Sequence, residues 1–265
     1  MGSATREALA ESRTALRAPG GAIDLATVDS LFQAGRAIGE SSQLLSALAD
    51  PAAAITARTA LVRAVFGAFV TGRALELLSA AVSQRWSERE DLLVGIEDLG
   101  LRATAVSAPE GASLEAELFA FGVAVTSDAD LELALVSKLG RADAKASLVE
   151  SLLAGKVSGQ TLLVVRHLVQ QPRGRRIGEM LRHAASVIAD QSGTTIATIS
   201  SAGPLMPGQL DRLKKSLSER YGRELTMHLV IDESLVGGVR VQIGQDVIDG
   251  SISSRLADLR LQLAR

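Results

Sequence analysis

The three histidines, His167, His183 and His228, are the residues best suited to bind a metal ion or to move a proton. They lie far apart and lack the short ligand spacing of a zinc site, so an exposed or half-buried histidine is the favoured interpretation of His228. Asp249 could act as a catalytic carboxylate, but the sequence places no second carboxylate or histidine to work with it. Helix capping is therefore favoured for Asp249. The chain has no cysteine, which excludes thiolate ligands, thiol nucleophiles and disulfides.

A basic cluster, Arg173-Gly174-Arg175-Arg176, could bind an anion at the start of the helix that follows it. The competing interpretation, a solvated linker between two helices, is favoured. No glycine-rich phosphate-binding pattern occurs, and one Trp and one Tyr offer little for the stacking of single-stranded bases. The sequence therefore predicts a protein that is not an enzyme, with no catalytic residue, metal ion or cofactor and no nucleic-acid partner.

The overall composition is that of a globular protein with a core. The 265 residues are 47% hydrophobic, and the formal net charge of -2 gives no global field that would draw the chain to nucleic acid or to an anionic membrane. The most apolar runs, Leu61 to Gly72 and Leu118 to Thr126, are shorter than the roughly 20 residues that span a bilayer. Residues Met1 to Leu16 carry charges instead of an apolar signal core. We expect no direct membrane insertion and an N-terminus that stays in the mature fold.

Amphipathic helices must position whatever function resides in the first 190 residues. Apolar residues recur at helical spacing, as in the stripe Leu25, Val28, Leu31 and Phe32, and candidate caps and breaks separate the helices. These candidates are Asp24, Asp50-Pro51, Thr71-Gly72, Ser87, Ser113, Ser127-Asp128 and Ser158-Gly159. The pattern predicts a helical bundle.

An internal repeat relates the two halves of this helical region. A shift of 87 positions aligns Leu31-Phe32 with Leu118-Phe119 without a gap, and 16 of the 59 pairs that begin at residues 31 to 89 are identical. A chance match between two Ala/Leu-rich stretches would seldom keep one register across several helices. The sequence predicts a duplicated bundle whose second copy lacks a counterpart of the first helix.

The last 75 or so residues change to a mixed pattern. Strands are predicted at Thr194 to Ser200, Glu224 to Ile231 and Val239 to Ile243, with a Gly244-Gln245 hairpin turn into Asp246 to Ile248. Helices are predicted from Gln209 to Tyr221 and from about Ser251, the last one with a stripe of Ile252, Leu256, Leu259 and Leu263 that would pack on its own sheet. The fold class is mostly α with a small α+β C-terminal domain, a β-α-β-β-α unit. The predicted domains are 1–108, 109–192 and 193–265.

The motif of this tail has two parts, Ile231–Val239 (IDESLVGGV) and Val247–Leu256 (VIDGSISSRL). Its physical interpretation is structural. Gly237 and Gly238 permit a sharp turn, and Asp249-Gly250-Ser251 form a strand-to-helix corner that caps the final helix. The candidate site residues are these motif positions: Gly237, Gly238, Asp249, Gly250, Ser251, Arg255 and Leu256.

These two segments resemble the C-terminal signature of the delta subunits of F-type ATP synthases, whose mitochondrial counterpart is the oligomycin-sensitivity-conferring protein. The resemblance covers the whole tail, whereas the helical region carries a second bundle where the common family member has one. It implies a stator subunit on the cytoplasmic face of the cell membrane. Its partners would be N-terminal segments of the alpha subunits and the helices of the b-type stalk subunit.

Helix-in-groove recognition is the binding mode that the resemblance implies, with the first helix and the Thr71 to Gln84 helix as candidate walls. The extra copy would lengthen the stator or add a second contact to the stalk. The alternative to this whole interpretation is a helical-repeat adaptor that binds amphipathic helices of another complex.

Overall fold

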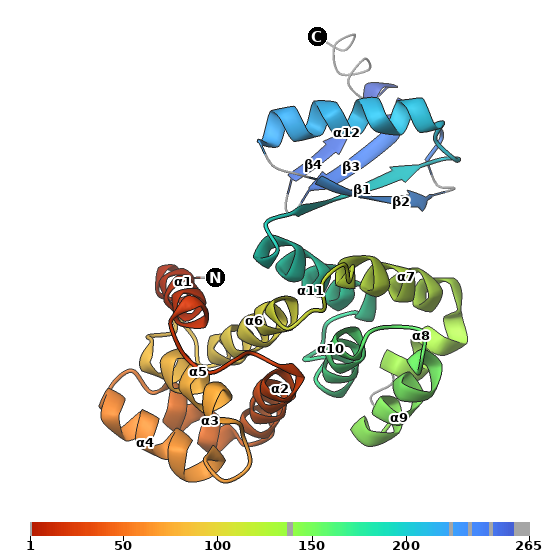
Figure 1. The fold of residues 1–265 in the computed structure, drawn as a ribbon. Coiled ribbons are helices and arrows are strands. Elements are labelled where there is room, and N and C mark those ends of the chain that lie inside the picture. The colour runs from red at the N-terminus through yellow and green to blue at the C-terminus, as the bar shows by residue number, and fades with distance from the viewer. Residues whose placement is uncertain (1, 137–139, 223–224, 233–234, 244–245, 257–265) are drawn as a thin grey trace. The chain divides into compact units, whose positions relative to one another are not determined.

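The protein is described by a computed structural model covering residues 2–136, 140–222, 225–232, 235–243 and 246–256. It divides into two compact units, Met1–Ile188, here called the helical unit, and Ala189–Arg265, the C-terminal unit. The helical unit contains α1 (Ser3–Arg17), α2 (Leu25–Glu40), α3 (Ser42–Ala49), α4 (Ile55–Phe66), α5 (Gly72–Ser83), α6 (Asp91–Val106), α7 (Leu114–Ser127), α8 (Ala129–Val136), α9 (Ala142–Leu153) and α10 (Gly159–Gln170), and α11 (Ile177–Gln191) leads into the C-terminal unit (Figure 1). The predicted fold class, mostly α with a small α+β C-terminal part, is confirmed.

The helix bounds repeat with the period read from the sequence. Helices α8, α9 and α10 begin and end 87 residues after α3, α4 and α5. Two caps repeat as well, since the side chains of Thr71 and Ser158 each accept a hydrogen bond from the backbone N–H three residues later. This agreement supports the duplication.

Helix α6 belongs to both copies. It closes the first bundle by packing against α1, α2 and α5, and it also contacts α10 of the second copy. It lies before α7 as α1 lies before α2, so it takes the place of the helix that we expected to be missing from the second copy. Nearly every residue from Leu92 to Thr104 is buried, as expected for a helix with neighbours on several sides. The predicted domain boundary at residues 108–109 falls inside the helical unit, just after this shared helix.

The C-terminal unit is a four-stranded sheet with one face covered by α12 (Pro207–Tyr221). The strands are β1 (Thr195–Ser201), β2 (Leu225–Ile231), β3 (Val239–Ile243) and β4 (Asp246–Asp249), in the order β2-β1-β3-β4. Strands β1 and β2 are parallel and joined through α12, whereas β3 pairs antiparallel with β1 and with β4. The segment predicted to follow the hairpin turn is thus a strand of its own, and the turn at 244–245 lies outside the described residues.

The core of this unit lies between one face of the sheet and α12. Ala197, Ile199, Leu225, Val241 and Ile243 are buried against Leu217 of α12. Residues 252–256 are helical after Ser251, but Ile252 and Leu256 remain 45% and 51% exposed. The expectation that this helix packs its stripe on its own sheet therefore finds no support at these two positions, while Leu259 and Leu263 lie outside the described residues.

Candidate functional site

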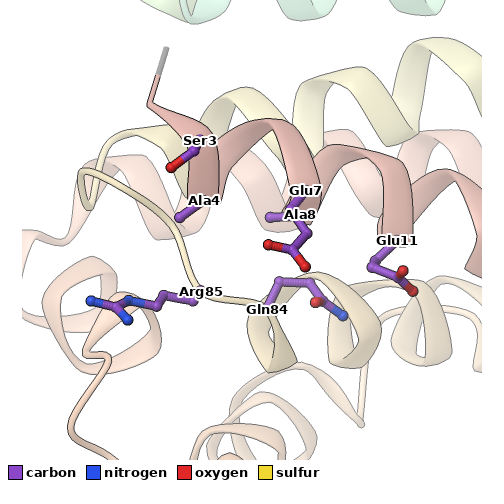
Figure 2. A pocket seen from close by; sticks show the side chains of 7 residues that line it. All are labelled: Ser3, Ala4, Glu7, Ala8, Glu11, Gln84 and Arg85. Atoms are coloured by element: carbon purple, nitrogen blue, oxygen red, sulfur yellow. The ribbon is translucent and has the colours of Figure 1, made fainter.

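A groove of about 530 Å³ lies between α1 and the end of α5. Its lining residues are Ser3, Ala4, Glu7, Ala8, Glu11, Gln84 and Arg85. Figure 2 shows the α1 side chains on one side of the groove and Gln84 and Arg85 on the other. Three of the lining residues, Ser3, Ala4 and Ala8, are small, so a partner backbone can approach α1 closely. One wall is α1, the first candidate helix of the sequence analysis, and the other is formed by Gln84 and Arg85, which follow the last residue of α5.

Polar contacts fix the two walls at both ends of α1. Near its start, the backbone N–H of Ser87 donates to Thr5 Oγ1 at 3.0 Å and that of Thr5 donates to Ser87 Oγ at 3.3 Å. Ser87 therefore bonds the segment that precedes α6 to α1. It does not cap α6, whose N-cap is Glu90. At the other end, Nη2 of the buried Arg73 donates to the carbonyls of Ala15, Leu16 and Ala18. The last carbonyls of a helix lack most of their intrahelical partners, so Arg73 caps the C-terminus of α1.

The groove is acidic on its α1 side. Glu7 and Glu11 are exposed, stand one helical turn apart and form no ion pair with any other described residue. Like charges at this spacing disfavour the helix by a few tenths of a kcal/mol. A cationic partner would relieve that repulsion. The sequence analysis missed these residues, although two glutamates spaced by four next to Ala4 and Ala8 were a readable signal.

A buried ionic cluster joins the two copies and corrects the interpretation of the basic segment. Glu97 of α6 is 3% exposed, and its carboxylate accepts from Arg175 Nη1 at 2.7 Å, from Arg175 Nη2 at 2.8 Å and from Arg173 Nη2. Neither a solvated linker nor an open anion site describes Arg173 and Arg175, because both guanidinium groups are already paired with this carboxylate. Sequence gave no signal of the pairing, since Glu97 lies more than 70 residues away.

His167 of α10 completes this cluster. Its side chain is buried, its ring stacks on Phe32 of α2 with a centroid distance of 4.2 Å, and its Nε2 lies 3.5 Å from Glu97 Oε2. Burial by itself would raise the pKa of Glu97. His167, Arg175 and Arg173 outweigh burial and hold this pKa well below its ordinary range. Burial also lowers the pKa of His167, and the pKa of the nearby His183 falls for the same reason.

Acidification is therefore expected to destabilise the helical unit. All three pKa values are lower in the folded chain, so the unfolded chain takes up protons first, from about pH 6.5 for the histidines and about pH 4.3 for Glu97. Stability is full above these values and is lost as the pH falls towards the folded pKa values. Urea unfolding followed by the fluorescence of Trp86, the only tryptophan, will measure this. His167→Phe is the control; a pH dependence between neutrality and pH 5.5 as steep as that of the wild type would contradict the role of His167.

The structure brings the two parts of the C-terminal motif together. The N–H of Gly250 donates to Val239 O at 2.9 Å, and that of Ile252 donates to Gly237 O at 3.0 Å. Gly237 and Gly238 adopt positive φ angles of 154° and 83°. The glycine turn therefore packs against the corner that starts the last helix.

Asp249 and Ser251 of this corner both accept hydrogen bonds from the backbone. Asp249 Oδ1 accepts from the N–H of Ser251 at 3.0 Å, and Ser251 Oγ accepts from that of Ser254 at 3.2 Å. The hydrogen bonds from Ser251, together with Arg240, lower the pKa of Asp249 to about 2. Arg255 and Leu256 are exposed beyond the corner. His228, predicted to be exposed or half-buried, is buried instead.

These features define a helical scaffold with a groove beside α1, followed by a small α/β unit. None of the described helices is long and apolar enough to cross a bilayer. Within the described ranges, no three histidine, aspartate or glutamate side chains are grouped to hold a metal ion.

Comparison with known proteins gives the particular family. Residues 101–263 match the family described as ATP synthase delta (OSCP) subunit. The chain is 54% identical over 264 residues to ATP synthase subunit delta of Leifsonia xyli subsp. xyli and 34% identical over 270 residues to that of Streptomyces griseus subsp. griseus, with all of each chain covered. A chain of the Toxoplasma gondii mitochondrial ATP synthase hexamer aligns with 64% of this chain and 96% of its own length, at 17% identity and a TM-score of 0.42. The chain belongs to the ATP synthase delta (OSCP) subunit family.

Proposed function

We propose that this chain is a non-catalytic peripheral-stalk subunit of an F-type ATP synthase and that the groove between α1 and α5 holds an N-terminal helix of the alpha subunits. The groove carries the proposal, because two tethered helices leave a furrow lined by small side chains with acidic groups along one side. A partner helix in such a furrow buries apolar area and gains specificity from its charged flank. Holding the catalytic head against torque calls for nanomolar binding, about -12 kcal/mol.

The C-terminal unit is proposed to bind the helices of the b-type stalk subunit. Seven exposed large apolar side chains among its described residues offer contact area: Met206, Leu229, Ile231, Val236, Val247, Ile252 and Leu256. The stalk would hold the chain at the cytoplasmic face of the cell membrane. The second helical copy, from α7 to α11, is proposed to lengthen the stator or to add a contact to the stalk.

Filling the groove is expected to detach the catalytic head. Ala4 is half-buried in the wall of α1, so Ala4→Trp should block a docking helix and lower head binding by about tenfold or more. The measurement is the recovery of alpha and beta subunits with the tagged chain from native membranes, together with proton-driven ATP synthesis. Stalk binding should persist, because the C-terminal unit is unchanged.

Ala10→Trp is the matched control, since Ala10 is exposed on α1 and does not line the groove. Equal recovery of the head with both variants would contradict the assignment of the groove. If the tagged wild-type chain brought down another complex without alpha and beta subunits, the adaptor alternative would replace the stator function.

A further inference from the structure

Two consecutive carboxylates of α6, Glu97 and Asp98, here called the α6 carboxylate pair, bind arginines from opposite ends of the helical unit's sequence. Asp98 Oδ1 accepts from Arg13 Nη2 of α1 at 3.1 Å. Glu97 accepts from Arg173 and Arg175, which precede α11. Consecutive residues of a helix point about 100° apart, so the two carboxylates face different neighbours. One turn of α6 therefore joins α1 to the segment that leads into α11.

The two connections lie between the parts of the chain that are proposed to bind the head and the stalk. Helix α1 forms one wall of the groove. The chain passes from the helical unit to the C-terminal unit once, within α11. Helix α11 is therefore the covalent route by which torque resisted by the stalk reaches the helical unit, and the α6 carboxylate pair connects the start of that route to the groove wall.

Ion pairs fix the geometry of such a junction better than apolar packing does. The Glu97 and Asp98 side chains are only 3% and 7% exposed, and each carboxylate accepts from two arginines, because Arg102 Nε also donates to Asp98 Oδ2 at 2.9 Å. Apolar contacts are non-directional, whereas hydrogen bonds between arginine and carboxylate set both distance and orientation. Buried ion pairs add little net stability, so their value here lies in holding one arrangement of α1, α6 and the α11 lead.

The backbone at Arg173 supports a function for this connection. Arg173 has a φ of 48°, and no other non-glycine residue in the described part of the chain has a positive φ. A side chain is unfavourable in this left-handed conformation. The strain is retained at a residue whose guanidinium reaches Glu97, and strain kept at a defined position points to a function of that position.

We propose that the α6 carboxylate pair positions α1 relative to α11 and gives the helical unit the stiffness that it needs to pass torque between the catalytic head and the stalk. Glu97 and Asp98 are buried and do not line the groove, so they act as positioning residues through Arg13, Arg173 and Arg175. The inference rests on the proposed function for the partners and the torque, and it adds the contacts that transmit the torque. Weakening these contacts leaves both binding surfaces intact but lets α1 move relative to α11.

The first test measures coupling in the assembled synthase. Arg13→Gln and Arg173→Gln each remove one connection and leave the buried carboxylate with a second arginine, so the fold should persist. In inside-out membrane vesicles, both variants and their double variant should recover alpha, beta and b-type subunits as the wild type does. The number of protons pumped per ATP hydrolysed should fall, and should fall furthest in the double variant. Arg89→Gln is the matched control, because the pair of Arg89 with Glu90 is exposed.

The second test measures stiffness in the full chain. The chain has no cysteine, so Ala10→Cys on α1 and Ser186→Cys on α11 place two spin labels at exposed positions. Double electron–electron resonance is expected to give a narrow distance distribution in the otherwise wild-type chain and with Arg89→Gln. The distribution should be broader with Arg13→Gln and Arg173→Gln together.

Three outcomes in the double variant would overturn the inference and leave the proposed function standing. These are an unchanged distance distribution, unchanged proton pumping per ATP hydrolysed, and loss of the head subunits from the complex, which would assign the contacts to binding. Trp86 fluorescence verifies that the variant is folded. A wild-type chain that recovered neither alpha and beta nor b-type subunits would instead refute the proposed function, and the inference with it.

Discussion

Replacing Glu97 by alanine is expected to lower the free energy of unfolding of the helical unit by about 3 kcal/mol. The carboxylate is almost fully buried and is held by Arg173, Arg175 and His167. Its removal leaves two guanidinium groups without a counter-charge at the junction between the copies. The side chains of Arg173 and Arg175 are 22% and 30% exposed, so both can turn partly to water. The expected loss of stability is therefore at the lower end of the range for breaking a buried ion pair. Urea unfolding followed by Trp86 fluorescence gives the measurement.

Glu90→Ala is the matched control for this experiment. Glu90 stands at the N-cap position of α6, the helix that carries Glu97, and its pair with Arg89 is exposed at both ends, so its loss should change the stability little. The double variant Arg173→Met, Arg175→Met in the Glu97→Ala background should recover part of the stability, because no unpaired buried charge then remains. Equal stability of the Glu97→Ala and Glu90→Ala proteins would contradict the role assigned to the cluster.

Replacing Gly238 by alanine is expected to destabilise the C-terminal unit by about 2–4 kcal/mol. The residue has a φ of 83°, where a side chain is strained. A Cβ atom there would also lie 2.5 Å from the carbonyl oxygen of Gly250 and 2.9 Å from Ser251 Cα. Both neighbours are backbone atoms of the corner that starts the last helix, so relief requires that corner to move. Hydrogen exchange of the amides in β1 and β3 measures the loss.

Gly222→Ala separates strain from collision. Gly222 has a φ of 62° but no atom within 4 Å of the position of a Cβ, so this variant carries only the conformational cost, about 1–2 kcal/mol. The difference between the two variants then reports the contact between the glycine turn and the corner. Trp86 lies in the other unit and its fluorescence should not change in either variant. Equal protection of the sheet in both variants would show that the contact contributes nothing.

Several features were predictable because they depend on local chemistry. The helix caps at Asp24, Thr71 and Ser158 and the corner at Asp249–Ser251 involve residues within three positions of each other. The positions of the strands followed from β-branched content and from the alternation of neighbouring residues. The repeat register was readable because packing keeps the same apolar and glycine positions in both copies.

Other features were not predictable, because they join residues distant in the sequence. Arg173 and Arg175 looked like a solvated linker until the fold placed Glu97 beside them. His167 looked like an ordinary histidine, and its stacking on Phe32 exists only because the first copy packs against the second. The helix expected to be missing from the second copy is α6, which shows little sequence similarity to α1 and is recognised by its position before α7 and by its contact with α10.

The sequence by itself determined the fold class, the 87-residue repeat, the C-terminal motif and hence the family. Each of these depends on neighbouring residues or on a fixed spacing along the chain. Only the tertiary structure decided which helix faces are covered. Helix α2, for example, packs against α5 of its own copy and against α10 of the second copy. Coverage depends on long-range packing of whole helices, and a single helix carries the same amphipathic pattern whether its outer face meets solvent or another helix.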